Sequence, residues 1–510
     1  MRYGFVIDQR RCIGCHACTV ACKEENQVPL GAFRTWVKYV ERGTFPNTRR
    51  SFAVLRCNHC DRAPCVTICP TVALYRRPDG IVDFDGDRCI GCKSCMQACP
   101  YDALYIDPNT RTAAKCHYCA HRVEVGLEPA CVIVCPEQAI VAGDLDDPGS
   151  RIARLVAREP VQVRKAEQGT RPKVYYLGAD AGALVPQLQS TTDRYLWAER
   201  PEGELDLVRM VAAAAVQEDQ GDGALSRPVY DVPHLPRPWG RKVSAYLWAK
   251  SIAAGPLLIA SVAVLGGGAP SSGLFGIAAP ALALLFLLAT TALLVLDLKR
   301  PERFHYILFK ANYRSSLVWG AWILIAYGGV AALWLASVLA GAGELVRFLA
   351  LPALVLAGAS AGYSAFLFGQ AEGRDFWQSS LLLPQLLVAA LVAGAASLLI
   401  VGFVSGADLG GLWTLSMVMA VALLLQGLVL TAELLVPHAS LDAARAAALI
   451  TRGEWKTPFW GGVIAAGTAL PIVLVWPTPY SAALGGALAL AGLWIYEDLW
   501  VKAGQSVPLS

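Results

Sequence analysis

The pattern of apolar and polar positions divides the chain into two unlike parts. Before about residue 243 the sequence is polar and is interrupted by charges and prolines. After that point, apolar stretches recur that are long enough to cross a bilayer as helices, which takes roughly 20 residues. We predict eight spans, the last two weaker because of prolines and terminal charges, at about 243–265, 274–296, 316–340, 348–369, 380–403, 412–436, 458–476 and 480–500.

Basic residues are distributed unequally between the two ends of these helices. One side holds only Arg347. The other side, which includes the flank before the first helix, holds Arg237, Arg241, Lys242, Lys250, Lys299, Arg300, Arg303, Lys310, Arg314, Arg374, Arg445, Arg452, Lys456 and Lys502. Because basic loops stay inside, we expect the polar part and both termini on the cytoplasmic side of a bacterial or archaeal inner membrane. The start, MRYGFVIDQRRC, has no apolar signal core, which agrees with this orientation.

The polar part holds every cysteine of the chain, in four groups of four. Each group opens with C-x-x-C and closes with C-x-x-x-C. The first and third groups have the full C-x2-C-x2-C-x3-C spacing of bacterial ferredoxins. Sixteen thiolates make four [4Fe–4S] clusters with none left over. The groups are Cys12, Cys15, Cys18 and Cys22; Cys57, Cys60, Cys65 and Cys69; Cys89, Cys92, Cys95 and Cys99; and Cys116, Cys119, Cys131 and Cys135.

Other interpretations of these cysteines compete less well. Structural zinc also uses C-x-x-C pairs, but it rarely uses the full ferredoxin run. Disulfides would require an oxidising compartment and a small secreted fold. The net charge of +4 is too small to indicate nucleic acid as a partner.

These patterns together predict a fold class and a division into domains. We expect α+β tandem bacterial-ferredoxin modules, followed by an all-α integral membrane bundle of eight transmembrane helices. The expected parts are a four-cluster domain at 1–150, a strap and linker at 151–240, and a membrane domain at 241–510. Within the linker, RPKVYYLGAD (171–180) predicts a short strand and a turn, and residues 203–220 predict a helix.

Several polar residues lie near the expected cytoplasmic ends of the membrane helices, and such residues are functional candidates. A row of clusters conducts electrons only between a donor and an acceptor, and the nearest two-electron partner in a membrane is a quinone. Its carbonyls need nearby proton donors or acceptors, and the candidates are Lys250, Asp297, Tyr363, Gln370 and Glu433. Snorkelling and helix-end capping would also explain each residue singly.

Two further features of the membrane part bear on packing and proton transfer. Gly358 and Gly362 form a G-x-x-x-G step, which is typical of close helix packing. No chain of ionisable residues crosses the outer half of the predicted membrane region, so the sequence does not indicate a proton pump.

The cysteine groups, including CNHCDRAPCVTICP and CHYCAHRVEVGLEPACVIVCP, resemble the four-cluster electron-transfer subunit of complex iron–sulfur molybdoenzymes, such as the polysulfide, dimethyl sulfoxide and sulfite-converting enzymes. The resemblance implies that groups one and four share clusters, as do groups two and three. The implied ligand sets are Cys12, Cys15, Cys18 and Cys135; Cys116, Cys119, Cys131 and Cys22; Cys57, Cys60, Cys65 and Cys99; and Cys89, Cys92, Cys95 and Cys69.

The membrane part resembles the NrfD-like, polysulfide-reductase-type membrane subunit. The similar segments are LDLKRPERFHYILFKANYRSSLVWGAW (296–322), GYSAFLFGQ (362–370), FWGGVIAAG (459–467) and VKAGQ (501–505). The sequence departs from the family at Tyr496, Glu497 and Asp498, where an arginine is usual. This resemblance implies a bound menaquinone or ubiquinone and no haem.

Together the two resemblances imply an electron-transfer and quinone-interacting subunit of a respiratory oxidoreductase, with a molybdopterin-type catalytic subunit as its cytoplasmic partner. The chain itself is not expected to convert the main substrate. An alternative is a subunit of a larger quinol-linked complex without molybdenum, similar to alternative complex III or to sulfur-metabolism transmembrane complexes. A transporter with a regulatory cluster domain is disfavoured, because the sequence has neither repeated halves nor broken mid-membrane helices.

Overall fold

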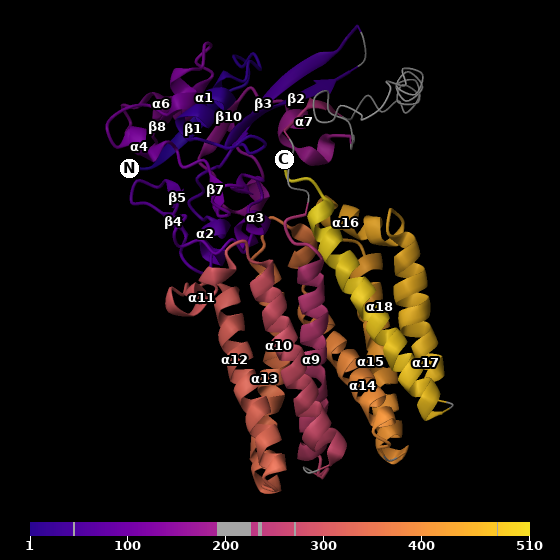
Figure 1. Cartoon of the computed structure of the whole chain (residues 1–510). Coiled ribbons are helices and arrows are strands. Elements are labelled where there is room, and N and C mark those ends of the chain that lie inside the picture. Colours follow the sequence, from indigo (N-terminus) through magenta and orange to yellow (C-terminus); the bar gives the residue numbers. More distant parts are fainter. Residues whose placement is uncertain (44–45, 191–225, 233–236, 270–271, 408, 477) are drawn as a thin grey trace.

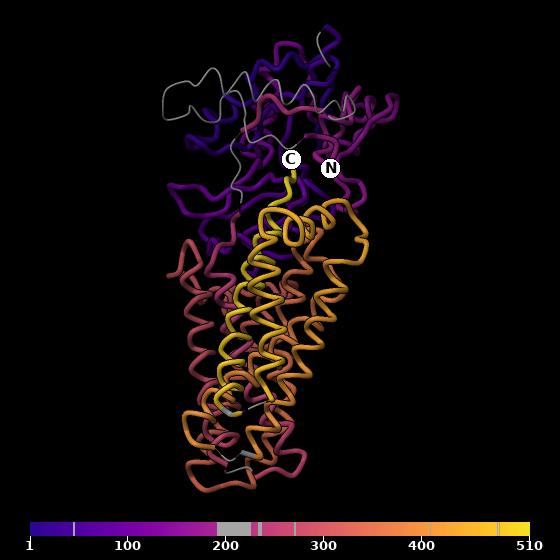
Figure 2. Tube along the Cα trace, turned by 90° about the vertical axis from the view of Figure 1, so that its right-hand side faces the viewer, coloured from indigo at the N-terminus to yellow at the C-terminus, as the bar shows by residue number. Residues whose placement is uncertain are grey.

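The structure, a computed structural model, describes the whole chain except residues 44–45, 191–225, 233–236, 270–271, 408 and 477. A head of strands and short helices stands on one end of a bundle of long helices (Figure 1). A view from the side shows the same arrangement, with the last residues of the chain entering the head (Figure 2). The helix expected over 203–220 lies outside the described residues.

The described residues of the head form two larger sheets and two hairpins. One sheet has the order β8-β1-β10-β9, with β10 parallel and β8 antiparallel to the central strand. The other has the order β11-β2-β3. The strands are β1 (Tyr3–Asp8), β2 (Thr35–Arg42), β3 (Arg49–Arg56), β4 (Leu74–Arg76), β5 (Val82–Phe84), β6 (Leu104–Ile106), β7 (Ala113–Lys115), β8 (Ile140–Asp144), β9 (Val161–Gln162), β10 (Val174–Leu177) and β11 (Arg227–Tyr230).

The central strand of the first sheet explains why this part of the chain holds together. Phe5, Val6 and Ile7 are fully buried, as expected for a strand covered on both faces. The strand expected within 171–180 is present as β10, whose Val174 pairs with Phe5. Residues after 150 therefore supply strands to both larger sheets, since β11 likewise pairs with β2.

Short helices carry the cysteine loops. Two of them, α2 and α3, end at Cys69 and Cys99, whose backbones are extended. The reason is that Pro70 and Pro100 follow, and a residue before proline is driven out of the helical region. The helices of the head are α1 (Ala17–Glu25), α2 (Pro64–Ile68), α3 (Ser94–Ala98), α4 (Ala120–Val123), α5 (Ala130–Ile133), α6 (Arg151–Arg158), η1 (Ala166–Gln168), α7 (Ala181–Leu184) and η2 (Pro186–Leu188).

Among the described residues, the bundle has seven helices long and apolar enough to span a membrane, together with the shorter apolar segment Pro458–Leu474. This agrees with the eight expected spans. The elements are α9 (Arg241–Leu265), η3 (Gly273–Ala278), α10 (Ala279–Asp297), η4 (Pro301–Arg303), α11 (Tyr306–Phe309), α12 (Ser316–Leu339), α13 (Gly343–Gly369), η5 (Asp375–Gln378), α14 (Leu382–Val404), α15 (Leu409–Leu435), α16 (Leu441–Thr451), η6 (Pro458–Ala469), α17 (Leu470–Leu474) and α18 (Pro479–Ser506).

Glycines decide how closely two of these helices approach. A Cβ added to Gly394 of α14 would overlap the backbone of Gly255 in α9, so no side chain fits at this crossing. The G-x-x-x-G step of α13 packs closely at one of its two glycines: a Cβ added to Gly362 would lie 2.6 Å from Leu383 Cδ1 of α14. A Cβ on Gly358 would meet nothing within 4 Å, and Gly358 and Gly362 both line a groove that also reaches Tyr363.

Candidate functional site

The four cysteine loops share one backbone conformation. The residue before the second cysteine of each group has a positive φ, at Gly14 (73°), His59 (44°), Gly91 (69°) and Tyr118 (64°). Glycine adopts this conformation freely. The two larger residues are held by hydrogen bonds, because the Val82 N–H donates to His59 Nδ1 at 3.2 Å and the Tyr118 hydroxyl donates to the Gly4 carbonyl at 2.7 Å.

Backbone N–H groups of the loops and of neighbouring segments point toward thiols. The amides of Gly91 and Ala113 both donate to Cys89 Sγ at 3.4 Å. The amide of His59 donates to Cys57 Sγ at 3.5 Å, and that of Ala139 donates to Cys135 Sγ at 3.3 Å. Such donors stabilise a sulfur that carries negative charge.

The fold brings the fourth cysteine of each group to the first three of another. One small cavity is lined by Cys22 with Cys116, Cys119 and Cys131, and a second by Cys69 with Cys89, Cys92 and Cys95. In the remaining sets, Cys135 acts electrostatically on Cys12, and Cys99 acts on Cys60 and Cys65. These neighbours correspond to the pairing implied by the resemblance.

The donor set fits an iron–sulfur cluster. Burial raises the pKa of Cys99 to about 11 and the pKa of Cys18 and of Cys116 to about 12. Thiols with such high pKa values stay protonated near neutral pH, so they become ligands only when a metal ion replaces the proton. Four soft sulfur donors around a cavity, with amide donors aimed at them, suit an iron–sulfur cluster.

The four sets follow one another in a row through the head. The set nearest the bundle contains Cys95, which interacts electrostatically with Cys65 of the second set. Cys57 of the second set interacts in the same way with Cys116 of the third set. Cys131 of the third set acts on Cys18 of the fourth. The row therefore runs from Cys92 beside the bundle to the exposed Cys15 at the far side of the head.

The last residue of α10 and the loop that follows it attach the bundle to the inner end of this row. Asp297 accepts from Lys93, with Nζ 2.8 Å from Oδ2, and Lys93 directly follows Cys92. The Arg303 guanidinium donates to the carbonyls of Gly86 (2.7 Å) and Cys89 (3.1 Å). The Asn312 amide donates to the Cys69 carbonyl at 2.8 Å. All of these bundle residues belong to the segment 296–322, which resembles the NrfD-like membrane subunit.

An apolar cavity of about 560 Å³ lies between this end of the row and helices α9, α10, α12 and α13. Its polar lining is sparse, which suits a large apolar ligand. One wall carries Cys92 and Ser94, so a molecule in the cavity lies next to the cysteine loop of the innermost set. The remaining polar or aromatic lining consists of Ser94, Trp239, Tyr246, Thr291, Asp297, Phe304 and Tyr363.

The structure brings some of the sequence candidates together and separates others. Asp297 and Tyr363 line the cavity, whereas Lys250 lies behind it, with its ammonium 5.0 Å from the centroid of the Tyr363 ring. Gln370 caps α12 by accepting from the Ser316 amide at 2.8 Å. Glu433 lies elsewhere, where it accepts from Tyr496 at 3.1 Å and Trp500 at 3.2 Å.

Sequence reasoning missed three residues that connect these parts. The Lys250 ammonium donates to Ser364 Oγ at 2.8 Å, and that oxygen lies 3.3 Å from the hydroxyl of Tyr246 on the cavity wall. Lys93 was overlooked although it stands inside a cysteine loop. A charged residue at that position is a usable signal, but Tyr246 and Ser364 have no local mark that distinguishes them from other membrane-helix residues.

A head with cysteine loops of ferredoxin type, joined to a helical membrane bundle, defines a membrane-embedded iron–sulfur protein. Residues 232–506 match the family model "Polysulphide reductase, NrfD", residues 49–145 match "4Fe-4S dicluster domain", and residues 10–26 match "4Fe-4S binding domain". The chain belongs to the NrfD polysulphide reductase family, with iron–sulfur ferredoxin domains fused in front of the membrane domain.

Curated proteins similar to part of this chain include subunits of several reductases. The B subunit of tetrathionate reductase from Salmonella typhimurium is 49% identical over 202 residues, which are 39% of this chain and 80% of that protein. The B chain of polysulfide reductase from Wolinella succinogenes is 41% identical over 188 residues, or 36% of this chain and 97% of that protein. The arsenate respiratory reductase iron–sulfur subunit ArrB of a Shewanella species is 36% identical over 226 residues, which cover 35% of this chain and 96% of that protein.

Proposed function

We propose that this protein relays electrons through four [4Fe–4S] clusters between a membrane quinone and a cytoplasmic molybdopterin-type catalytic subunit. The observation that carries the proposal is the continuity of the row of thiol sets with the apolar cavity, which meet at Cys92. When bound, the clusters supply one-electron redox steps. The residues of the chain hold them, separate them from water and present the innermost one to the bilayer.

The assignment of four clusters rests on four repeated loops and four converging thiol sets. We assign as ligands all sixteen cysteines in the sets described above. The left-handed residue in each loop supports one cluster per loop, because the four loops share this backbone conformation. No haem is part of the proposal.

The cavity is the proposed quinone site. Tyr363 and Tyr246 present hydroxyl-bearing rings to it, and Lys250 reaches Tyr246 through Ser364. These groups provide the hydrogen-bond donors that a quinone carbonyl needs and a route for its protons. We assign Asp297 a positioning role, because both of its oxygens accept from Lys93, at 2.9 and 2.8 Å.

The outer end of the row is the proposed docking face of the catalytic subunit. Large apolar side chains are exposed around the exposed Cys15, and an apolar patch on a soluble face marks a partner surface. They belong to groups one and four or adjoin them: Ile13, Val20, Leu30, Ile133 and Val134. The reductase names of the relatives support such a partner. The basic helix ends near the head support its cytoplasmic location.

Metal analysis of the intact complex, purified without oxygen, tests the relay. We expect about sixteen iron atoms per chain on the ferredoxin ligand rule, paramagnetic signals after reduction, and molybdenum or tungsten in the copurified partner. Zinc in place of iron would refute the relay. Iron without molybdenum or tungsten would refute the molybdopterin partner and leave the relay standing.

Single substitutions in the cavity test the quinone site. Tyr363→Phe and Tyr246→Phe each remove one hydroxyl and should lower quinone turnover at least about tenfold, since positioned proton donors contribute roughly 10²–10⁴-fold. Tyr327→Phe is the matched control, because its hydroxyl is buried in the same bundle and donates to the Ala253 carbonyl at 2.6 Å, away from the cavity. Full turnover in both cavity variants would place the quinone elsewhere.

A further inference from the structure

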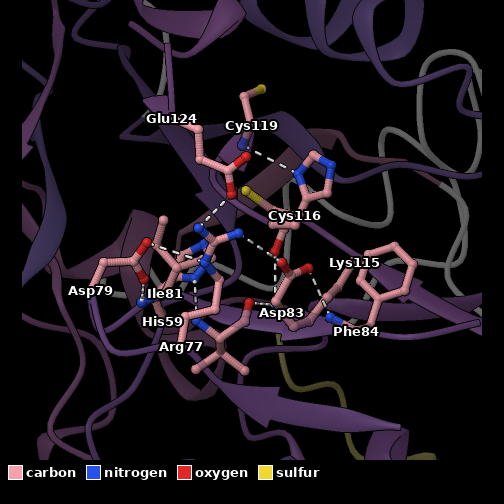
Figure 3. A network of polar contacts seen from close by, with 12 residues as sticks. His59, Arg77, Asp79, Ile81, Asp83, Phe84, Lys115, Cys116, Cys119 and Glu124 are labelled. Carbon is pink, nitrogen blue, oxygen red and sulfur yellow. Dashed lines mark hydrogen bonds and ion pairs between the residues drawn. The ribbon is translucent and has the colours of Figure 1, made fainter. Parts of the chain in front are cut away.

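Arg56 and Lys115 are buried cations inside the head, and neither has a carboxylate partner among the described residues. Arg56 is 1% exposed, and its Nε and one terminal nitrogen have no hydrogen-bond partner in the described part of the chain. Lys115 is fully buried and donates to the backbone carbonyls of Val82 and Cys116 (Figure 3). A buried charge without a counter-charge is strongly destabilising. Both cations therefore require an anion in their surroundings.

The thiolates, and whatever they bind, are the groups placed to supply that anion. The remaining terminal nitrogen of Arg56 donates to Cys131 Sγ at 3.2 Å, and its guanidinium also interacts with Cys116 and Cys18. Lys115 precedes Cys116 in the chain and acts on Cys65. Arg56 thus adjoins the set of Cys22, Cys116, Cys119 and Cys131, which we call the third set, counting from the membrane. Lys115 lies near both this set, through the Cys116 carbonyl, and the set that contains Cys65.

The third set receives a further donor. The side-chain amide of Asn26 lies 3.6 Å from Cys22 Sγ and 3.7 Å from Cys119 Sγ. Three of the four sulfurs of this set therefore face a nitrogen donor, and one of those donors is a guanidinium that stays protonated at every pH a protein meets.

Two other cations near the row are paired with carboxylates, in contrast to Arg56 and Lys115. Lys93, beside Cys92, is paired with Asp297 at 2.8 Å. Arg77 meets three carboxylates, those of Asp79 (3.1 Å), Asp83 (3.6 Å) and Glu124 (2.6 Å) (Figure 3).

We propose that Arg56, supported by Lys115 and Asn26, raises the reduction potential of the cluster held by the third set, so that this site stores an electron within the relay. The inference rests on the proposed function. Its physical basis is that cluster potentials are set by net charge, by hydrogen bonds to sulfur and by burial. A positive charge in a buried site favours the reduced cluster, which carries one more negative charge than the oxidised one.

Redox titration of the full-length complex, followed by electron paramagnetic resonance, tests this inference. Cys119→Ser identifies the signal of the third set by altering it. Arg56→Gln should then change the ratio of reduced to oxidised cluster at fixed potential at least tenfold toward the oxidised form. A tenfold change corresponds to about 59 mV for one electron. Lys115→Met should lower the reduction potential of the third set and also that of the set containing Cys65.

Two variants serve as controls. Arg56→Lys keeps the charge and should keep the potential near that of the wild type. Arg62→Gln removes an exposed arginine from a cysteine loop. It should leave the reduction potential of every cluster unchanged, because water and salt screen the charge of Arg62. If Arg56→Gln fails to retain iron, Asn26→Leu provides the test, since it removes a donor from the same sulfurs and should lower the same signal.

The outcomes separate this inference from the proposed function. Loss of every cluster signal in the wild type would overturn both. If the clusters are intact but the reduction potential of the third set is unchanged in Arg56→Gln, the role of Arg56 is overturned and the relay stands. The same holds for Asn26→Leu when that variant has to replace Arg56→Gln. A shift confined to another set would likewise overturn the role of Arg56.

Discussion

The ion pair between Lys93 and Asp297 should hold the head on the bundle, and its removal gives a measurable loss of stability. The Lys93 side chain is 5% exposed and that of Asp297 is 17% exposed, with their charged atoms 2.8 Å apart. At an effective dielectric constant of about 20, the Coulomb attraction at this distance is roughly 6 kcal/mol. Desolvation offsets part of it, and removing one partner of a buried pair costs about 3–5 kcal/mol.

Asp297→Asn should therefore destabilise the head by about 3 kcal/mol or more, because Lys93 is left buried without its counter-charge. For a cooperative unit of about 150–250 residues, a loss of that size lowers the melting temperature by roughly 6–12 °C. The assay is thermal unfolding of the purified complex in lipid nanodiscs, monitored by cluster absorbance. A double-mutant cycle with Lys93→Met should give a non-additive pair, the double variant being more stable than the sum of the singles predicts.

A matched pair in the same loop is the control. Arg300 and Glu302 lie 3.2 Å apart but are 32% and 57% exposed, and such surface pairs contribute only about 0–1 kcal/mol. Glu302→Gln should lower the melting temperature far less than Asp297→Asn does. Equal effects of the two substitutions, or strict additivity in the Lys93 and Asp297 cycle, would contradict the reasoning.

Further predictions concern the bundle. Gly394→Leu should prevent folding of the membrane domain or strongly lower its yield, because even a Cβ there would overlap Gly255. Gly358→Leu is the control and should leave the yield unchanged, because a Cβ at Gly358 meets no atom within 4 Å. Fluorescence-detected size-exclusion chromatography measures both yields. Glu433→Gln should retain quinone turnover within about twofold, since Glu433 lies outside the cavity lining, but should lower the melting temperature by weakening its bonds to Tyr496 and Trp500; a large loss of turnover at normal stability would assign it to the site. Arg374→Met should loosen the head from the bundle, because the Arg374 guanidinium donates to Gln97 at 2.9 Å and to the carbonyl of Val507 at 3.1 Å; increased protease cleavage between the two parts is the expected readout, and unchanged cleavage would contradict it.

The features that the sequence predicted well are those carried by neighbouring residues. Cysteine spacing and apolar length are local properties, so the ferredoxin-type loops and the spanning helices could be located without a fold. The same holds for the ends of α2 and α3, because Pro70 and Pro100 directly follow the cysteines at which those helices stop. The hydropathy pattern also placed Asp297 and Tyr363 near one end of the bundle.

The tertiary structure decided which of these residues meet. The resemblance implied how the cysteine groups share clusters, but their spacing alone left open which groups converge in space. Lys93 and Asp297 are 204 positions apart, so no local pattern could pair them. The G-x-x-x-G step predicted packing, which holds for Gly362 against Leu383 of α14, whereas Gly358 faces a groove. Contacts of this kind depend on the path of the whole chain, and only the folded arrangement shows that a buried cation, a thiol set and an apolar cavity lie along one row.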